Sequence, residues 1–117
     1  MLINCVAYEN GVKLADLDIK EISDYLTRPD CFVWVALANA TSEELDEMKA
    51  EFSLHELAVE DARHGHQRPK IEEYDDSLFI VMHLLDFHYG VDGEEEINVG
   101  EVDIFIGKNY VLSVRNN

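Results

Sequence analysis

The feature that most constrains the fold is an unbroken apolar run of seven residues, Cys31–Leu37, near the end of the first third of the chain. Its β-branched and aromatic side chains favour a strand, and the lack of polar alternation predicts that both faces of this strand are covered. Phe32 and Trp34 of this run, and Phe105 later in the chain, are expected in the core rather than on a platform that stacks nucleic-acid bases. The chain of 117 residues has the length of one domain, so we expect a single domain over 1–117.

Three elements are expected before this run. Met1–Tyr8 is rich in apolar residues, Glu9-Asn10-Gly11 indicates a turn, and Val12–Leu14 is expected to pair back as a short strand. Apolar residues spaced by three and four over Leu17–Leu26 predict a short amphipathic helix.

Two helices are expected after the run. Thr41 and Glu44 form a capping-box pattern, and the spacing of Leu45, Met48 and Phe52 predicts a helix with one apolar face. A second short helix is expected from about Leu54 to Ala62, followed by an irregular connection over Arg63–Lys70. The predicted inward stripe of this second helix consists of Leu54, Leu57, Ala58 and Asp61.

The last third of the chain changes to the pattern of strands joined by tight turns. The four expected strands are Ile71–Tyr74, Ser77–Phe87, Ile97–Ile106 and Tyr110–Arg115. Short connections make these strands antiparallel neighbours, whereas Cys31–Leu37 needs a crossover to join them. The predicted fold class is α/β, or α+β on a stricter definition. The sheet is mixed but largely antiparallel, with about six to seven strands and short helices packed on it.

Such a sheet has too few helices to cover both faces. We therefore expect the chain to be a piece of a longer protein, the alternative being a stand-alone soluble module that dimerises through the bare face.

Charge and composition exclude several classes of function. Nine Lys and Arg residues against 25 Asp and Glu residues give a net charge of −16, which disfavours nucleic acid and anionic membrane surfaces and favours cations or a basic partner. The apolar run Leu78–Leu85 is far shorter than the roughly 20 residues of a membrane span, and no leader sequence is visible. Two cysteines indicate a reducing compartment rather than a disulfide scaffold.

The patterns of common catalytic and metal sites are missing from the sequence. It has no C-x-x-C pair, H-E-x-x-H motif, EF-hand loop or nucleophile elbow, and Cys31 is expected to be a packing thiol, so we do not expect an enzyme. His55, His64 and His66 are close enough in sequence to form a zinc site of a hydrolase. The simpler interpretation is that these histidines bond to backbone or water.

The acidic pair Glu60-Asp61 is the more informative candidate. Asp61 shares the predicted apolar stripe, where a carboxylate is costly unless it is paired or hydrogen-bonded. Either Asp61 accepts hydrogen bonds from the following turn or pairs with Arg63 or Arg68, or the two carboxylates belong to a hard-cation site shared with another element.

Several segments, in this order, resemble the cytoplasmic N-terminal domain of the CorA family of magnesium and cobalt transport proteins. The most specific are His55-Glu56-Leu57-Ala58-Val59-Glu60-Asp61 and His66-Gln67-Arg68-Pro69-Lys70. Phe32-Val33-Trp34-Val35, Glu101-Val102-Asp103-Ile104-Phe105 and the last strand add to the resemblance, which covers residues 32–115.

This resemblance implies a regulatory domain of a homopentameric transporter. It implies that Glu60 and Asp61 bind regulatory Mg²⁺, with Co²⁺ as a second ion, together with a carboxylate of a stalk helix, and that neighbouring subunits share the site. The domain would lie at the cytoplasmic face of the inner membrane, and the isolated piece would hold no metal tightly.

The sequence departs from the family pattern where ion conduction is concerned. The family's pore signature Gly-Met-Asn, its stalk helix and its two membrane spans are not found here. The resemblance therefore extends only to cation sensing. It also leaves open the same domain of a ZntB-like zinc transporter.

Overall fold

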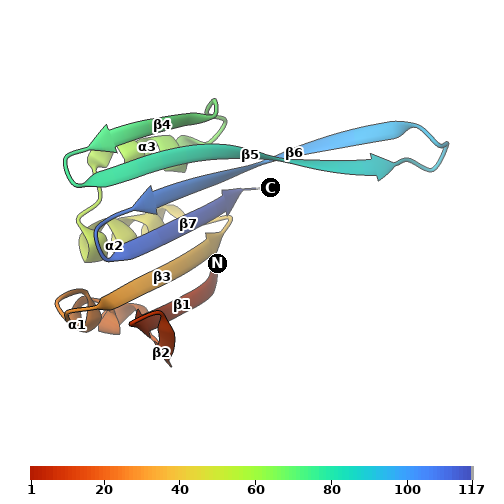
Figure 1. Ribbon diagram of the computed structural model, residues 1–117. Helices are drawn as coiled ribbons and strands as arrows, with labels where there is room; N and C mark the ends of the chain where they lie inside the picture. Colours follow the sequence, from red (N-terminus) through yellow and green to blue (C-terminus); the bar gives the residue numbers. More distant parts are fainter. Residues whose placement is uncertain (117) are drawn as a thin grey trace.

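The computed structural model describes residues 1–116, which form a seven-stranded mixed sheet and three short α-helices (Figure 1). The elements in chain order are β1 (Leu2–Glu9), β2 (Val12–Asp16), the 3₁₀ turn η1 (Ile19–Glu21), α1 (Ile22–Leu26), β3 (Cys31–Ala38), α2 (Ser42–Phe52), α3 (Glu56–His64), β4 (Lys70–Tyr74), β5 (Ser77–Tyr89), β6 (Glu95–Ile106) and β7 (Tyr110–Asn116). The predicted α+β class, the mixed sheet and its strand number are confirmed.

The sheet has the strand order β2-β1-β3-β7-β6-β5-β4. Within residues 1–116, β3 and β7 are the one parallel pair, with Val33 opposite Tyr110 and Leu37 opposite Val114, and the other neighbouring strands are antiparallel. The predicted crossover is therefore present: α2, α3 and the β4–β6 meander separate β3 from β7 in the chain. The last strand lies in the centre of the sheet, between β3 and β6 (Figure 1).

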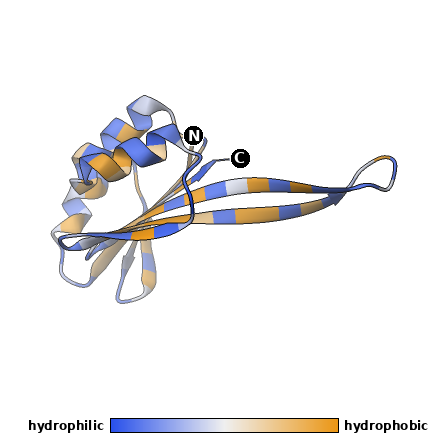
Figure 2. Cartoon of the chain, turned by 90° about the horizontal axis from the view of Figure 1, so that it is seen from above, coloured by the Kyte–Doolittle hydropathy of each residue, from blue (hydrophilic) through white to orange (hydrophobic). Residues whose placement is uncertain are grey.

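The helices cover one face of this sheet only (Figure 2). Along β3, Cys31, Val33, Val35 and Leu37 are buried, while Phe32, Trp34 and the other alternate residues are only half-buried. The prediction that both faces of this strand are covered was wrong, and so was the assignment of Phe32 and Trp34 to the core. Trp34 and Val111, opposite each other on β3 and β7, lie on the face without helices.

The core lies between the sheet and the helices. Phe52 of α2 stacks on Tyr110 with 4.5 Å between ring centroids, and Phe79 contacts Phe105 at 4.9 Å. Phe105 is thus a core residue, as predicted, and Cys31 is a buried free thiol. These aromatic contacts join α2 and β5 to the central strands.

The helices begin and end close to where the sequence places them. The predicted capping box of α2 is present: Thr41 Oγ1 accepts from the Glu44 N–H at 3.1 Å and Glu44 Oε1 accepts from the Thr41 N–H at 2.9 Å. This backbone hydrogen bond and the nearby N-terminal amine lower the pKa of Glu44. The helix predicted over Leu17–Leu26 is shorter, because its first part is the 3₁₀ turn η1.

The inward stripe of α3 differs from the prediction. His55 caps this helix, and its buried side chains are those of Ala58, Val59 and Ala62. Leu57 is 63 % exposed, so its place on the predicted stripe was wrong. Because the inward face is rotated away from Leu57, Asp61 lies at the border of that face and is half-buried.

Strands β5 and β6 extend beyond the rest of the sheet as a two-stranded arm, residues 82–99 (Figures 1 and 2). The molecule measures 55 × 29 × 24 Å, and the arm accounts for the long axis. Its large apolar side chains are exposed, among them Leu85, Phe87 and Val99. No helix among the described residues combines the length and apolarity that crossing a bilayer requires.

Candidate functional site

Glu60 and Asp61 are consecutive in α3, so their side chains point in directions about 100° apart around the helix. Glu60 faces outward toward α2, whereas Asp61 faces β4. The structure therefore assigns the two predicted metal ligands to two different polar groups. One is an exposed outer network around Arg63, and the other is an inner cluster around Lys70.

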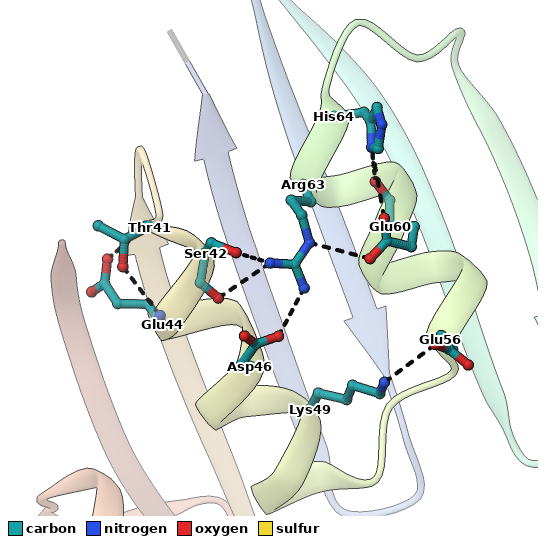
Figure 3. A network of polar contacts seen from close by, with 9 residues as sticks. All are labelled: Thr41, Ser42, Glu44, Asp46, Lys49, Glu56, Glu60, Arg63 and His64. Carbon is teal, nitrogen blue, oxygen red and sulfur yellow. Dashed lines mark hydrogen bonds and ion pairs between the residues drawn. The ribbon is translucent and has the colours of Figure 1, made fainter.

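The outer network consists of Ser42, Asp46, Glu60 and Arg63 and joins α2 to α3 (Figure 3). Arg63 Nε lies 3.2 Å from Glu60 Oε1, and Arg63 Nη2 lies 2.8 Å from Asp46 Oδ1. Arg63 Nη1 also donates to the Ser42 hydroxyl and, at 3.4 Å, to the Ser42 carbonyl. The hydrogen bond that Arg63 donates to Asp46 is the main cause that raises the pKa of Arg63. Two carboxylates here share one guanidinium at the surface.

The inner cluster consists of Lys70 and the four carboxylates of Asp61, Glu72, Glu101 and Asp103. Lys70 Nζ lies 2.7 Å from Asp61 Oδ2 and 2.5 Å from Glu72 Oε1. Asp61 thus has a lysine partner nine residues away, so the alternative that it pairs with Arg63 or Arg68 was wrong. Hydrogen bonds to Asp61, and then to Glu72, raise the pKa of Lys70 above its ordinary range.

Glu72 is held from a second side by Tyr74, whose hydroxyl donates to Glu72 Oε2. The hydrogen bonds from Lys70 and Tyr74 lower the pKa of Glu72. The same contact with a carboxylate raises the pKa of Tyr74 to about 12. Glu72 is therefore ionised at neutral pH and keeps a donor besides Lys70.

The other two carboxylates of the inner cluster come from β6 and are buried. Asp103 has no exposed surface and Glu101 is 8 % exposed. Val81 of β5 lies opposite both Lys70 of β4 and Asp103 of β6, so these residues form one row across three strands, on the helix-covered face. Glu101 lies two positions before Asp103 and therefore on the same face.

These buried carboxylates lack partners for most of their oxygens. Glu101 Oε1 accepts from the Gln67 N–H at 2.9 Å, but Glu101 Oε2 and both Asp103 oxygens have no hydrogen-bond partner among the described residues. Burial, followed by interaction with Glu101, raises the pKa of Asp103 to about 8. At neutral pH the Asp103 carboxyl is thus largely protonated.

Sequence reasoning missed the acidic pair on β6, although the strand carries a signal for it. Glu101, Asp103 and Phe105 alternate along β6 and therefore lie on the same face of the strand, and Phe105 belongs to the core. Two acidic residues on the same strand face as a core aromatic residue indicate buried carboxylates. Lys70 was placed in the connection after α3 rather than in β4, so its reach toward Asp61 was missed as well.

The three candidate zinc ligands do not converge. His55 Nδ1 accepts from the Leu57 N–H at 3.2 Å, and its ring stacks on Tyr74 with centroids 3.9 Å apart. His64 Nδ1 lies 2.9 Å from the Glu60 carbonyl oxygen, one turn earlier in α3 (Figure 3). Within residues 1–116, no three histidine, cysteine, aspartate or glutamate side chains are grouped so that they could hold a metal ion. Helix capping and backbone contacts account for His55 and His64.

An open cavity of about 620 Å³ lies beside the inner cluster, over the base of the arm. Glu101, His64, His66 and His83 are among the residues that line it. His83 Nε2 lies 2.8 Å from the Gln67 carbonyl oxygen, and the Gln67 N–H donates to Glu101. These contacts fasten the connection after α3 to β5 and β6, and they leave Glu101 at the floor of an accessible hollow.

Comparisons with known proteins agree with the sequence resemblance. The family model described as CorA-like Mg²⁺ transporter protein matches residues 29–117. The chain is 33 % identical over 87 residues to the "Putative metal ion transporter YfjQ" of Bacillus subtilis, covering 74 % of this chain and 25 % of that protein. It is also 33 % identical over 61 residues to the cobalt/magnesium transport protein CorA of Thermotoga maritima, covering 52 % of this chain and 16 % of that protein. The chain therefore spans a quarter or less of the length of these relatives.

Solved structures share the fold at low sequence identity. The full-length CmaX protein superimposes with a TM-score of 0.68 at 18 % identity, covering 99 % of this chain and 35 % of the other. The soluble domain of CorA from Methanocaldococcus jannaschii gives a TM-score of 0.64 at 21 % identity, covering 98 % of this chain and 42 % of that domain. The complete CorA magnesium transporter of the same organism gives 0.61 at 16 % identity, covering all of this chain and 33 % of that protein. On the family match over most of its length, this chain belongs to the family of CorA-like Mg²⁺ transporter proteins.

Proposed function

We propose that this chain is the cytoplasmic, cation-sensing domain of a CorA-like transporter of magnesium or cobalt, and that it regulates transport without conducting ions. In this proposal Glu60 and Asp61 bind a regulatory dication together with a carboxylate of a stalk helix in a neighbouring subunit of a homopentamer. The dication holds the transporter closed, and its loss at low ion concentration releases the closed state.

The observation that carries the proposal is the position of Asp61. Its side chain is about a third exposed, so a carboxylate from another chain can reach it, yet it also belongs to a cluster with four carboxylates and one ammonium. Such an excess of negative charge at an accessible edge favours a cation over any other ligand. The net charge of −16 adds a long-range attraction for cations.

The available donor atoms suit a hard dication. Mg²⁺ prefers carboxylate oxygens and keeps several of its waters, so one or two protein carboxylates are enough to hold it weakly. Glu60 lies one residue from Asp61 but is engaged by Arg63 at 3.2 Å, so we expect it to act through metal-bound water or after rotating away from Arg63. Zinc prefers nitrogen and sulfur donors, which makes the ZntB-like alternative the weaker one on chemical grounds.

A paramagnetic probe tests this proposal on the chain as it stands. Mn²⁺ added to ¹⁵N-labelled protein should broaden amide signals of α3 near Asp61 and of β4 near Lys70, and excess Mg²⁺ should reverse the broadening. Asp61→Asn should remove the effect and Glu60→Gln should weaken it. Glu47→Gln, which removes an exposed carboxylate of α2, is the matched control and should change little.

The regulatory part needs the transporter that carries this domain. There, Asp61→Asn together with Glu60→Gln should shift inhibition by Mg²⁺ to higher concentrations, because closure depends on a higher affinity of the closed state for the ion. Unchanged inhibition curves, or Mn²⁺ broadening that is insensitive to Asp61→Asn, would refute the assignment.

A second candidate is favoured by the uncovered face of the sheet. Half-buried apolar side chains lie there on adjacent strands, including Trp34, Ile104 and Val111, which is the kind of surface that a dimerising interaction module hides. Light scattering after size-exclusion chromatography separates the two. A stable dimer that Trp34→Ser dissociates, without Mn²⁺ broadening at Asp61, would favour the module.

A further inference from the structure

The inner cluster already holds a cation of its own. Lys70 Nζ lies 2.7 Å from Asp61 Oδ2 and 2.5 Å from Glu72 Oε1, and these are the two more exposed carboxylates of the cluster. Asp103 of the same cluster is fully buried, and neither of its oxygens has a hydrogen-bond partner within residues 1–116. The ammonium therefore occupies the place where an external cation would find the most carboxylates.

Strand register explains why this lysine reaches the site. Lys70, Val81 and Asp103 form one row across β4, β5 and β6, with neighbouring strands about 4.8 Å apart. The side chain of Lys70 extends over this row, with its Nζ 5.9 Å from the centre of the Phe79 ring. Its position is fixed by two ion pairs and by the aromatic ring below it.

We propose that Lys70 is a tethered cation that competes with divalent cations for Asp61, so that a dication binds there only by displacing the ammonium toward Glu72. The inference rests on the proposed function, since it concerns the same carboxylate. The inference adds Lys70 as a residue that sets the affinity of Asp61 for a dication. Competition by the ammonium keeps that affinity low, and the ammonium neutralises carboxylate charge while no dication is bound.

The exchange of the ammonium for a dication can run in both directions, because each cation has a carboxylate to pair with. Asp61 and Glu72 share the one ammonium, so the two carboxylates outnumber the positive charge that pairs with them and leave room for a dication at Asp61. The displaced ammonium is not left unpaired, because Glu72 still holds it.

Substituting Lys70 by methionine tests the competition. Methionine keeps much of the length and apolar volume but removes the charge, so Lys70→Met should bind Mn²⁺ at Asp61 about tenfold more tightly than the unsubstituted chain. Amide broadening measures this affinity, and competition by Mg²⁺ should show the same gain. Its melting temperature should also rise on adding MgCl₂ by more than on adding NaCl of equal ionic strength.

Lys49→Met is the matched control. It removes one positive charge from α2, where Lys49 Nζ lies 3.9 Å from Glu56 Oε1, and should leave Mn²⁺ binding at Asp61 nearly unchanged (Figure 3). If Lys70→Met does not fold, the double variant with Asp103→Asn also removes a buried carboxyl group that lacks a hydrogen-bond partner among the described residues, and the same gain in affinity is expected from it.

The outcomes separate the two proposals. Binding that Asp61→Asn abolishes but Lys70→Met leaves unchanged would overturn the competition and support the sensing role. Binding at Asp61 that is seen only after Lys70→Met would support the competition and count against the sensing role of the unsubstituted chain. No binding at Asp61 in either protein would overturn both.

Discussion

The outer network and the inner cluster are built from the same kinds of side chain but differ in charge balance and in burial. Arg63 is shared by two carboxylates at the surface, where water and salt screen each contact. Lys70 pairs with two carboxylates, those of Asp61 and Glu72, beside two buried carboxyl groups on β6. A surface ion pair can be lost at small cost, whereas removing the single cation of a partly buried acidic group leaves uncompensated charge. Most of the electrostatic stability of this fold should therefore depend on Lys70.

The largest effect is expected from Lys70→Met. Without dications at pH 7.5, this variant should lower the free energy of unfolding by about 2 kcal/mol, which is less than for a fully buried pair because Lys70 keeps contact with water. Urea denaturation measures the loss. A loss no greater than that caused by Arg63→Met would show that the inner cluster does not differ from the outer network.

A somewhat smaller effect, of opposite sign, is expected from Asp103→Asn. Burial raises the pKa of Asp103 to about 8, whereas the unfolded chain titrates near its ordinary value of about 4. Between these pH values the native state holds a proton that the unfolded state has released, so stability falls as pH rises from about 4 to about 8. Asp103→Asn removes this dependence and should stabilise the protein by about 1–2 kcal/mol at pH 8.

Unfolding free energies of both proteins at pH 5 and pH 8 check this prediction. The difference in unfolding free energy between the two proteins should be small at pH 5 and large at pH 8. The other titrating groups are common to both proteins, so their contributions cancel in this difference. A difference that does not vary with pH would mean that Asp103 titrates normally and is not isolated from solvent.

Arg63→Met should have a smaller effect than either inner-cluster variant. It breaks the contacts between α2 and α3, so its thermal midpoint should fall slightly, and the fall should shrink in 0.5 M NaCl because salt screens exposed charges. The Lys70→Met loss should be less sensitive to salt. Equal salt sensitivity of the two variants would remove the distinction between the networks.

The smallest effect is expected from Glu60→Gln. Glu60 is half exposed and Arg63 keeps Asp46 as a partner, so stability should change by no more than about 0.5 kcal/mol. Chemical denaturation at low salt measures it. A larger loss would place Glu60 among the structural residues and weaken its role as a metal ligand.

Local sequence patterns predicted the fold well because its helix starts, turns and strands are specified by residues that are close together in the sequence. The capping box at Thr41, the turn at Asp75 and the period-two strands of the last third all formed as expected. The uncovered face was anticipated in general from the shortage of helices. Phe32 and Trp34 were nevertheless assigned to the core, because an apolar run indicates burial but not which layer provides it.

The candidate site was predicted less completely, because its chemistry depends on register rather than on neighbours in sequence. Glu60 and Asp61 were found through a motif, but their separation onto two sides of α3 follows from helix geometry and from the positions of α2 and β4. The contact of Asp61 with Lys70 depends on where β4 begins. The position of Asp103 in the same row as Lys70 depends on how β4, β5 and β6 align, which no local sequence pattern specifies.

The central claim is that the cation held by Asp61 can be exchanged. Anomalous scattering from crystals of the chain soaked in MnCl₂ tests it most directly. The account predicts a manganese peak within about 2.0–2.4 Å of an Asp61 carboxylate oxygen, with the Lys70 ammonium turned toward Glu72. Crystals that keep the Lys70–Asp61 ion pair and show manganese only on other carboxylates, at every concentration tried, would contradict it.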